Sequence, residues 1–172
     1  MLSIIIPTLN CRDELVRTLD AFALRPSAWE IVISDGGSTD GTLEAAELAG
    51  ARTLVGPAGR GRQLAAGADA AGGVWFLFWH ADTQPQPGWV PIVISDEYYE
   101  HVGGFMPLPL MEDVDIVRRI GHRRLVVLDT AAVTSAVRYR RDGWWGRPIK
   151  NITCLSMYLL GMPISMIRKL YG

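Results

Sequence analysis

Short apolar runs recur at regular intervals along the first 80 positions of the chain. They occupy Leu2–Pro7, Glu30–Ser34, Arg52–Val55 and Val74–Trp79. Such β-branched or aromatic runs predict buried strands. Between them, Leu15, Leu19 and Phe22 recur at helical spacing, TLEAAELA follows Asp40, and an alanine-rich stretch runs to Ala71. Strands alternating with helices indicate parallel pairing, so we expect an α/β fold with a mainly parallel, Rossmann-like sheet flanked by helices.

The second half of the pattern is less regular. A helix is predicted from Glu112 to about Ile120, and strands are predicted at LVVLD and AVTSAV. The stretch GWWGRPIKNITCLSMYLL predicts a terminal helix that ends near Gly161 and Pro163. Asn10 and Asp40 are the candidate caps for the first and second helices.

Polar residues and glycines follow each of the four strands. Parallel sheets bind ligands beyond the carboxyl ends of their strands, so these groups are expected on one rim. The candidates are Pro7, Thr8 and Asn10; Asp35, Gly36 and Gly37; Arg60, Arg62 and Gln63; and His80, Ala81 and Asp82. The chain has no G-x-G-x-x-G after its first strand, no phosphate-binding P-loop motif and no G-x-S-x-G.

Each rim group has a chemical interpretation and a plainer alternative. Asp35 can accept hydrogen bonds from a base or ribose, or DGGSTDG is only a turn. Arg60 and Arg62 can hold a diphosphate, or they form a solvated basic loop. Asp82 suits Mg²⁺ or Mn²⁺, and His80 either joins it or hydrogen-bonds the backbone.

Four motifs occur in a specific order: SIIIPTLN, EIVISDGGSTDGT, FLFWHADT and GGF with MEDVD. In this order they resemble the signatures of family-2 glycosyltransferases with the GT-A fold, over roughly Ser3 to Arg141. HADT with LPLMEDVD is similar to a small bacterial subgroup. The resemblance implies one domain over 1–172, with a nucleotide-sugar-binding half (1–95) and an acceptor and catalytic half (96–172) that includes the C-terminal helix.

The resemblance also implies roles for single residues. Asp35 would hold the base and ribose of the donor. Asp82 would carry the divalent cation, Mn²⁺ or Mg²⁺, although His80 replaces the first aspartate of the usual D-x-D motif. Asp113 of the Glu112–Asp113 pair would deprotonate the acceptor hydroxyl, and a single in-line displacement would invert the anomeric carbon. A basic segment with Arg138 and Arg140 would close over the diphosphate, and Trp144 or Trp145 would stack on a sugar.

These roles agree with the chemistry that the displacement of a nucleoside diphosphate requires. Charge that builds on the leaving oxygen needs a cation or arginines, and the acceptor needs a carboxylate base. Alternatives remain open for two groups. Asp113 can instead complement a helix dipole, and the arginines near Trp144 can instead snorkel from an amphipathic helix.

The interval between Asp82 and Glu112 departs from the family pattern. It spans only 30 positions, whereas similar enzymes have a further strand and a longer segment before GGF. Either this member is shortened near Ser95–Asp96, or residues are missing from the sequence. We favour the second explanation, because EYYEHVGGF keeps the end of the usual segment.

Composition limits the setting and the partners. The net charge is −1, which argues against a nucleic-acid partner, and the two cysteines form no disulfide framework. We expect a cytoplasmic protein, with peripheral contact to the inner membrane through its C-terminal tail as one alternative and a buried terminal helix as another. The acceptor, whether glycan, lipid-linked or small molecule, stays open, and so does a homodimer. A catalytically silent nucleotide-binding module is the main competing function, ahead of a nucleotidyltransferase.

Overall fold

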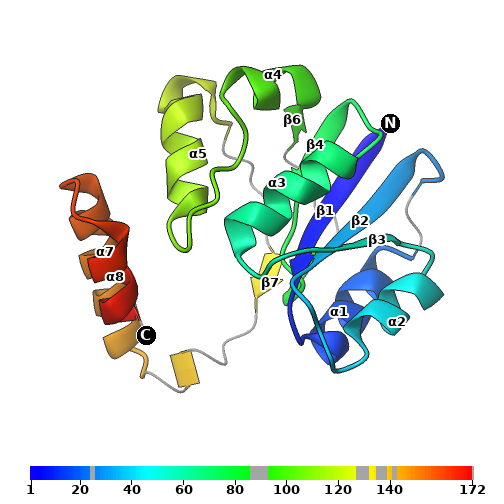
Figure 1. Cartoon of the computed structure of the whole chain (residues 1–172), viewed down its shortest axis with the longest axis horizontal. Helices are drawn as coiled ribbons and strands as arrows, with labels where there is room; N and C mark the ends of the chain where they lie inside the picture. The colour runs from blue at the N-terminus through cyan, green and yellow to red at the C-terminus, as the bar shows by residue number, and fades with distance from the viewer. Residues whose placement is uncertain (24–25, 86–92, 127–131, 135–138, 141–142, 172) are drawn as a thin grey trace.

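A five-stranded sheet forms the centre of the molecule in this computed structural model, which describes residues 1–23, 26–85, 93–126, 132–134, 139–140 and 143–171 (Figure 1). The strands are β1 (Leu2–Thr8), β2 (Trp29–Asp35), β3 (Arg52–Val55), β4 (Trp75–Phe78) and β6 (Ile94–Ser95). Their order is β3-β2-β1-β4-β6, and only β6 runs antiparallel to its neighbour. The expected α/β class with a mainly parallel sheet is confirmed.

Helices cover both faces of this sheet. They are α1 (Arg12–Ala21), α2 (Thr42–Leu48), α3 (Arg60–Ala70), α4 (Asp96–His101) and α5 (Glu112–Ile120). Successive residues of β1 point to opposite faces. Ile4 and Ile6 belong to the core cluster formed with α1 and α2, and Ile5 belongs to the cluster formed with α3, α4 and α5. The β-branched runs are therefore apolar on both sides because both sides are covered.

The loops after β1 and β2 are joined by hydrogen bonds between their polar side chains and backbone amides. Cys11, not Asn10, precedes α1, and the Asn10 side chain accepts a hydrogen bond from the Thr39 amide at 2.8 Å. The Asp40 carboxylate accepts from the Arg12 amide at the start of α1 and from the Thr42 amide, both at 3.1 Å. The prediction of Asn10 as the cap of α1 is wrong, because its side chain bonds the neighbouring loop. The prediction of Asp40 as the cap of α2 is also wrong in position, because Gly41 is the N-cap, although the Asp40 carboxylate bonds the first amide of that helix.

The region beyond α5 differs from the pattern-based expectation. A short turn of 3-10 helix, η1 (His122–Arg124), follows α5, and Leu125 and Val126 of LVVLD are not in a strand. β7 (Ala132–Thr134) falls within AVTSAV and pairs with β5 (Thr83–Pro85) in a two-stranded sheet. The remaining residues of these two predicted strands lie outside the described ranges.

Two helices, α7 (Gly146–Leu159) and α8 (Ile164–Tyr171), form a hairpin at one end of the molecule (Figure 1). Met111, Cys154 and Ile167 make a small core beneath them. The prediction of one terminal helix is incomplete, because Pro163 was interpreted as a stop although proline also suits the start of a new helix. Among the described residues, no helix is long and apolar enough to cross a membrane.

The segment around Ser95 connects β6 to α4 directly. Ile94 and Ser95 pair with β4, and the Ser95 hydroxyl accepts a hydrogen bond from the Tyr98 amide at 3.2 Å. Ser95 is therefore the N-cap of α4. Whether residues are missing at this junction stays untested.

Candidate functional site

A cleft of about 500 Å³ opens at the carboxyl ends of β1 and β4. It is lined by Pro7, Thr8, Leu9, Asn10, Cys11, Glu14, Gly59, Arg60, Gln63, His80, Ala81 and Asp82. Eight of the twelve rim residues proposed from the sequence are in this lining. The other four, Asp35, Gly36, Gly37 and Arg62, are not. Because parallel strands end at the same edge of the sheet, residues from three separate segments of the chain line one cavity.

Asp35, the last residue of β2, is fully buried and bonds Thr8 of the cleft lining. Its Oδ1 accepts hydrogen bonds from the amides of Gly37 (2.8 Å) and Ser38 (2.7 Å), and its Oδ2 accepts from the hydroxyls of Thr8 (2.8 Å) and Ser38 (2.5 Å). Burial raises the pKa of this carboxyl, but the hydrogen bonds outweigh it and hold the pKa below its usual value. Four protein donors already occupy the carboxylate, so its direct contact with a nucleotide stays a prediction.

Gln63 and Gly36 hold the floor of the cleft together. The Gln63 amide donates to the backbone oxygens of Thr8 (2.7 Å) and Ser34 (2.8 Å), at the ends of β1 and β2. A Cβ at Gly36 would lie 3.1 Å from the Cα of Ala58, so glycine permits this close approach. Both residues have structural tasks here, and their nucleotide contacts stay predictions.

His80 and Asp82 present the donor set that a divalent cation could use. Both line the cleft, directly after β4. Desolvation by the surrounding chain, and then the nearby Arg60 cation, lower the pKa of His80 despite the opposing carboxylates. The ring is therefore neutral near pH 7 and has a lone pair to offer. Within the described residues, no group of three or more His, Cys, Asp or Glu side chains is placed to hold a metal.

A second, smaller cavity of about 200 Å³ adjoins the cleft and contains the acidic pair. Arg60 and His80 line both cavities, and Glu112 and Asp113 line only the second. The Arg60 Nε donates to Oε1 of Glu112, and an Arg60 Nη lies 3.9 Å from Oδ2 of Asp113. Arg60 thus links the strand-end cleft to the start of α5.

The two acids differ in exposure. Glu112 is fully buried, and its Oε2 is a buried atom without a hydrogen-bond partner among the described residues. The Asp113 side chain is 62% exposed, which leaves its carboxylate accessible to a substrate. Met111, just before the pair, has φ of 65°. Positive φ is costly for methionine, and such conformations cluster at functional sites.

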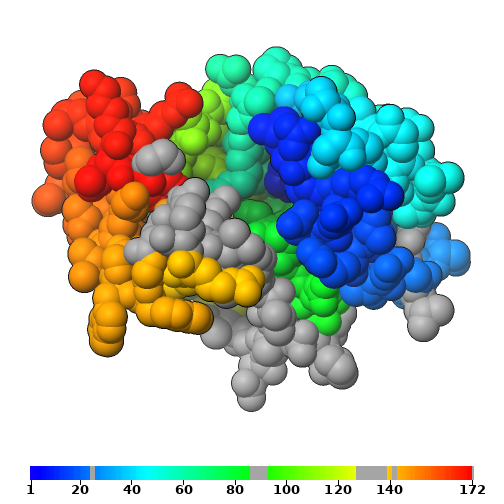
Figure 2. Space-filling view, turned by 90° about the horizontal axis from the view of Figure 1, so that it is seen from below, coloured from blue at the N-terminus to red at the C-terminus, as the bar shows by residue number. Residues whose placement is uncertain are grey.

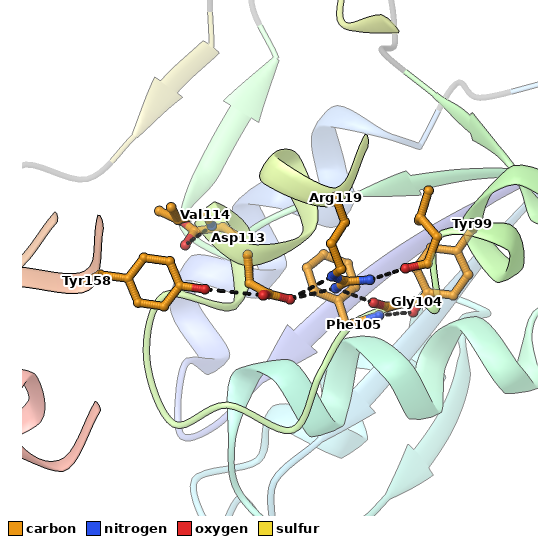
Figure 3. A network of polar contacts seen from close by, with 9 residues as sticks. Tyr99, Gly104, Phe105, Asp113, Val114, Arg119 and Tyr158 are labelled. Carbon is orange, nitrogen blue, oxygen red and sulfur yellow. Dashed lines mark hydrogen bonds and ion pairs between the residues drawn. The ribbon is translucent and has the colours of Figure 1, made fainter. Parts of the chain in front are cut away.

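A polar network fixes the helix that carries the acidic pair (Figure 3). Arg119 donates to Asp115 on the same helix, at 2.6 and 2.9 Å, and to the carbonyl oxygen of Gly104 at 2.6 Å. The Tyr158 hydroxyl of α7 donates to Asp115 from the other side at 3.2 Å. The last aspartate of MEDVD therefore joins α5 to the GGF turn and to the C-terminal hairpin.

The expected closing segment is only partly described. Arg138 lies outside the described residues. Arg140 and Trp144 are exposed, and the Trp144 ring lies 5.7 Å from the Tyr139 ring. Neither residue belongs to the lining of the two cavities. The roles proposed for Arg138, Arg140 and Trp144 stay predictions.

Four lining residues of the cleft escaped the sequence interpretation: Leu9, Cys11, Glu14 and Gly59. Leu9 and Gly59 neighbour the residues that were named, so proximity in sequence was the available signal. Cys11 and Glu14 belong to the start of α1, which reaches the cleft only through the turn after β1. Burial raises the pKa of the Cys11 thiol, which keeps it protonated.

Comparison with known proteins gives a family match over most of the chain. The model of the family described as Glycosyl transferase family 2 matches residues 3–149. Two mycobacterial proteins, from Mycobacterium bovis BCG and Mycobacterium tuberculosis H37Rv, are named as PGL/p-HBAD biosynthesis glycosyltransferases. Each is 40% identical over 90 residues, which is 48% of this chain and 35% of the relative. The matched part is thus about a third of the length of these curated relatives.

Solved structures overlap about half of the chain. S. aureus TarS 1-349 in complex with UDP is 26% identical, with a TM-score of 0.45, over 49% of this chain and 28% of that chain. Glucosyl-3-phosphoglycerate synthase from Mycobacterium tuberculosis, in complex with Mn²⁺, UDP and glucosyl-3-phosphoglycerate, is 25% identical. Its TM-score is 0.44, over 48% of this chain and 34% of that chain.

Proposed function

Because the chain belongs to glycosyl transferase family 2, we propose that it moves a sugar from a nucleoside-diphosphate sugar to an acceptor hydroxyl. The observation that carries this proposal is the pair of adjoining cavities. One lies at the strand ends, the other contains Glu112 and Asp113, and Arg60 and His80 line both. A donor in the first cavity would have its reactive end near the acids of the second.

The donor would bind in the strand-end cleft. Thr8 and Asn10 offer polar contacts along one wall, and Arg60 supplies a cation for the diphosphate. Arginine suits this task because its planar guanidinium donates two parallel hydrogen bonds to phosphate oxygens. The negative charge on the departing diphosphate would be offset at this point.

A divalent cation fits the same wall. Mg²⁺ and Mn²⁺ are commonly held by one or two protein ligands together with substrate phosphates. Asp82 and neutral His80 would therefore be enough protein ligands for such an ion. When bound, the ion would neutralise charge on the diphosphate. The imidazole in place of a first aspartate favours Mn²⁺ over Mg²⁺, because Mg²⁺ prefers oxygen ligands.

Asp113 is the proposed general base. Its exposed carboxylate, on the first turn of α5, faces the second cavity, where an acceptor hydroxyl could lose its proton to it. Glu112 is buried and bound to Arg60, so it would hold that arginine in place and not touch the acceptor. A single displacement at the anomeric carbon would invert its configuration.

Calorimetric titration tests the donor site of this proposal. UDP, GDP and dTDP would each be titrated with and without Mn²⁺, into the wild-type protein and into Asp82→Asn. We expect one nucleotide to bind tightly only with Mn²⁺, and Asp82→Asn to weaken that binding by about tenfold or more, the loss of one good ligand contact. Asp69→Asn, an exposed carboxylate outside the cleft, is the matched control and should bind as wild type. Equal binding by Asp82→Asn, or no binding of any nucleotide, would contradict the proposal.

A further inference from the structure

Helix α7 has its apolar side turned outward. Trp145 at its N-cap, Ile149, Ile152, Leu159 and Leu160 are 84%, 61%, 64%, 54% and 81% exposed. Successive positions on a helix are 100° apart, so these residues form one stripe along it, with Ser156 as the polar member in the same row. A surface helix of a globular protein normally buries such a stripe against the core.

The opposite side of α7 faces the protein and is partly polar. Arg147 is only 3% exposed, and its guanidinium lies 4.3 Å from the centre of the Tyr171 ring of α8. The Lys150 ammonium donates to the Tyr171 carbonyl oxygen at 3.3 Å, and the Tyr158 hydroxyl bonds Asp115. Cys154 is fully buried between them. These contacts fix the orientation of the helix, so its apolar stripe cannot be the side that packs on the protein.

Charge distinguishes this hairpin from the rest of the chain. Residues 143–171 contain Arg147, Lys150, Arg168 and Lys169 and no aspartate or glutamate. The remaining residues contain 13 basic and 18 acidic side chains, a formal charge of −5. The hairpin lies at the end of the molecule remote from the N-terminal helices, as Figures 1 and 2 both show. Arg168 and Lys169 of α8 are exposed, whereas Arg147 and Lys150 lie on the protein-facing side of α7. The net charge of +4 at this end of the molecule, together with the exposed apolar stripe of α7, complements a partner that is negatively charged and has an apolar interior.

We propose that the outward face of α7 docks on the surface of a membrane that contains anionic lipids. Helices that lie in the plane of a membrane interface combine an apolar face, basic residues and aromatic side chains, and they bind with the apolar face among the headgroups and upper acyl chains. With 14 residues, α7 is too short to span a bilayer but suits this position. Trp145, at the start of the stripe, would sit at headgroup depth.

A second copy of this chain fits the same face less well. A symmetric dimer sets the same patch of each subunit against the other. The hairpin would then meet another hairpin with four basic and no acidic side chains. Anionic lipid supplies the opposite charge, whereas a second copy repeats the same charge.

Vesicle co-sedimentation of the full chain tests this docking. The vesicles would contain phosphatidylcholine alone, or phosphatidylcholine with about one third phosphatidylglycerol. We expect binding to the anionic vesicles and a loss of about tenfold in the partition coefficient with Ile152→Glu, which places a carboxylate in the stripe. Leu48→Glu makes the same kind of change at a 90% exposed position of α2 and should bind as wild type. Arg168→Gln with Lys169→Gln should reduce the preference for anionic vesicles.

Three results would overturn the docking proposal. One is a wild-type protein that stays in the supernatant with both vesicles. Another is an Ile152→Glu variant that binds as well as wild type, or a Leu48→Glu control that loses as much binding as Ile152→Glu. The third is a lipid-free dimer in sedimentation velocity that Ile152→Glu converts to a monomer, which would assign the face to a second copy. Thermal unfolding of Ile152→Glu should match wild type because its side chain is in solvent, and nucleotide titration of this variant keeps a docking failure distinct from a donor-site failure.

Discussion

Asp35 and Glu112 are both completely buried, and each has a different means of holding its charge. Neutral donors from Thr8, Gly37 and Ser38 surround the Asp35 carboxylate. Glu112 instead depends on one cation, Arg60, and its other oxygen has no hydrogen-bond partner in the part of the chain that the structure describes. A buried carboxylate surrounded by several neutral donors does not depend on any one of them, whereas a buried carboxylate paired with a single cation depends on that cation.

At Asp35, the lowered pKa predicts a pH-dependent contribution to stability. The contribution is complete well above the usual carboxyl pKa, and it is lost as the pH falls through the lower pKa of the folded state. We expect Asp35→Asn to lower the unfolding free energy by about 3 kcal/mol at pH 7. Urea unfolding at several pH values should show this difference shrink as the solution is acidified. A difference that is constant with pH, or one equal to that of the exposed Asp69→Asn, would contradict this account.

At Arg60, removal of the guanidinium should leave Glu112 charged and unpaired. We expect Arg60→Ala to destabilise the protein by about 3 kcal/mol, as for other broken buried pairs. Adding Glu112→Gln should recover much of that loss, because the neutral amide does not need the cation. Arg62→Ala, on the exposed side of α3, is the matched control. Chemical unfolding of wild type, Arg60→Ala, Glu112→Gln and the double variant gives the coupling energy, and a coupling near zero would show that the pair is not stabilising.

At the scale of secondary structure, the close packing of α3 on β1 sets the width of the cleft. Gly67 of α3 lies directly over β1, so a Cβ there would come within 2.5 Å of the Ile5 Cγ2 atom. Ile5 is fully buried and β-branched and cannot turn aside. The N-terminal end of the same helix carries Arg60 and Gln63. A change in the distance between α3 and β1 would therefore move Arg60 and Gln63 relative to the strand ends.

We expect Gly67→Ala to lower the unfolding free energy by about 2 kcal/mol through overpacking. Gly56→Ala is the control, because nothing lies within 4 Å of a Cβ at that position and its φ is not positive. Thermal unfolding of both variants would measure the difference. Equal melting temperatures would show that α3 can move away from β1 at little cost.

The sequence predicted the elements of the first half well because each strand contains a short run of apolar, mostly β-branched or aromatic residues, and turn or polar residues follow it. β3 matches its predicted bounds. Thr8, Arg60, His80 and Asp82 line one cleft, as expected for residues that follow parallel strands. The Arg60–Glu112 pair could not be predicted, because the partners are 52 positions apart and only the three-dimensional fold brings them together. The sequence left open whether the apolar side of the terminal helix is exposed or buried, because a periodic pattern shows that a helix has an apolar face but not whether that face is covered.

At the scale of the whole molecule, the two cavities join segments from both halves of the chain. The strand ends of the first half form the cleft, and α5 brings the acidic pair of the second half beside it. The network of Asp115, Arg119 and Tyr158 holds α5 between the GGF turn and the C-terminal hairpin (Figure 3). The proposed reaction would require this arrangement, because the proposed donor site and the proposed base belong to different halves of the chain.

The most direct test is the rate of nucleoside-diphosphate release from the sugar nucleotide whose base the titrations identify. The assay would include Mn²⁺ and a cell extract as acceptor source, and would compare wild type, Asp113→Asn and the exposed control Asp69→Asn. We predict that Asp113→Asn lowers the rate by about 100-fold or more, which is the rate enhancement that a general base typically contributes. Nucleotide binding by this variant should stay as in wild type. Asp69→Asn should be as active as wild type. Equal rates for Asp113→Asn and wild type, or nucleotide binding without any release by wild type, would contradict the proposed enzyme and favour a silent nucleotide-binding module.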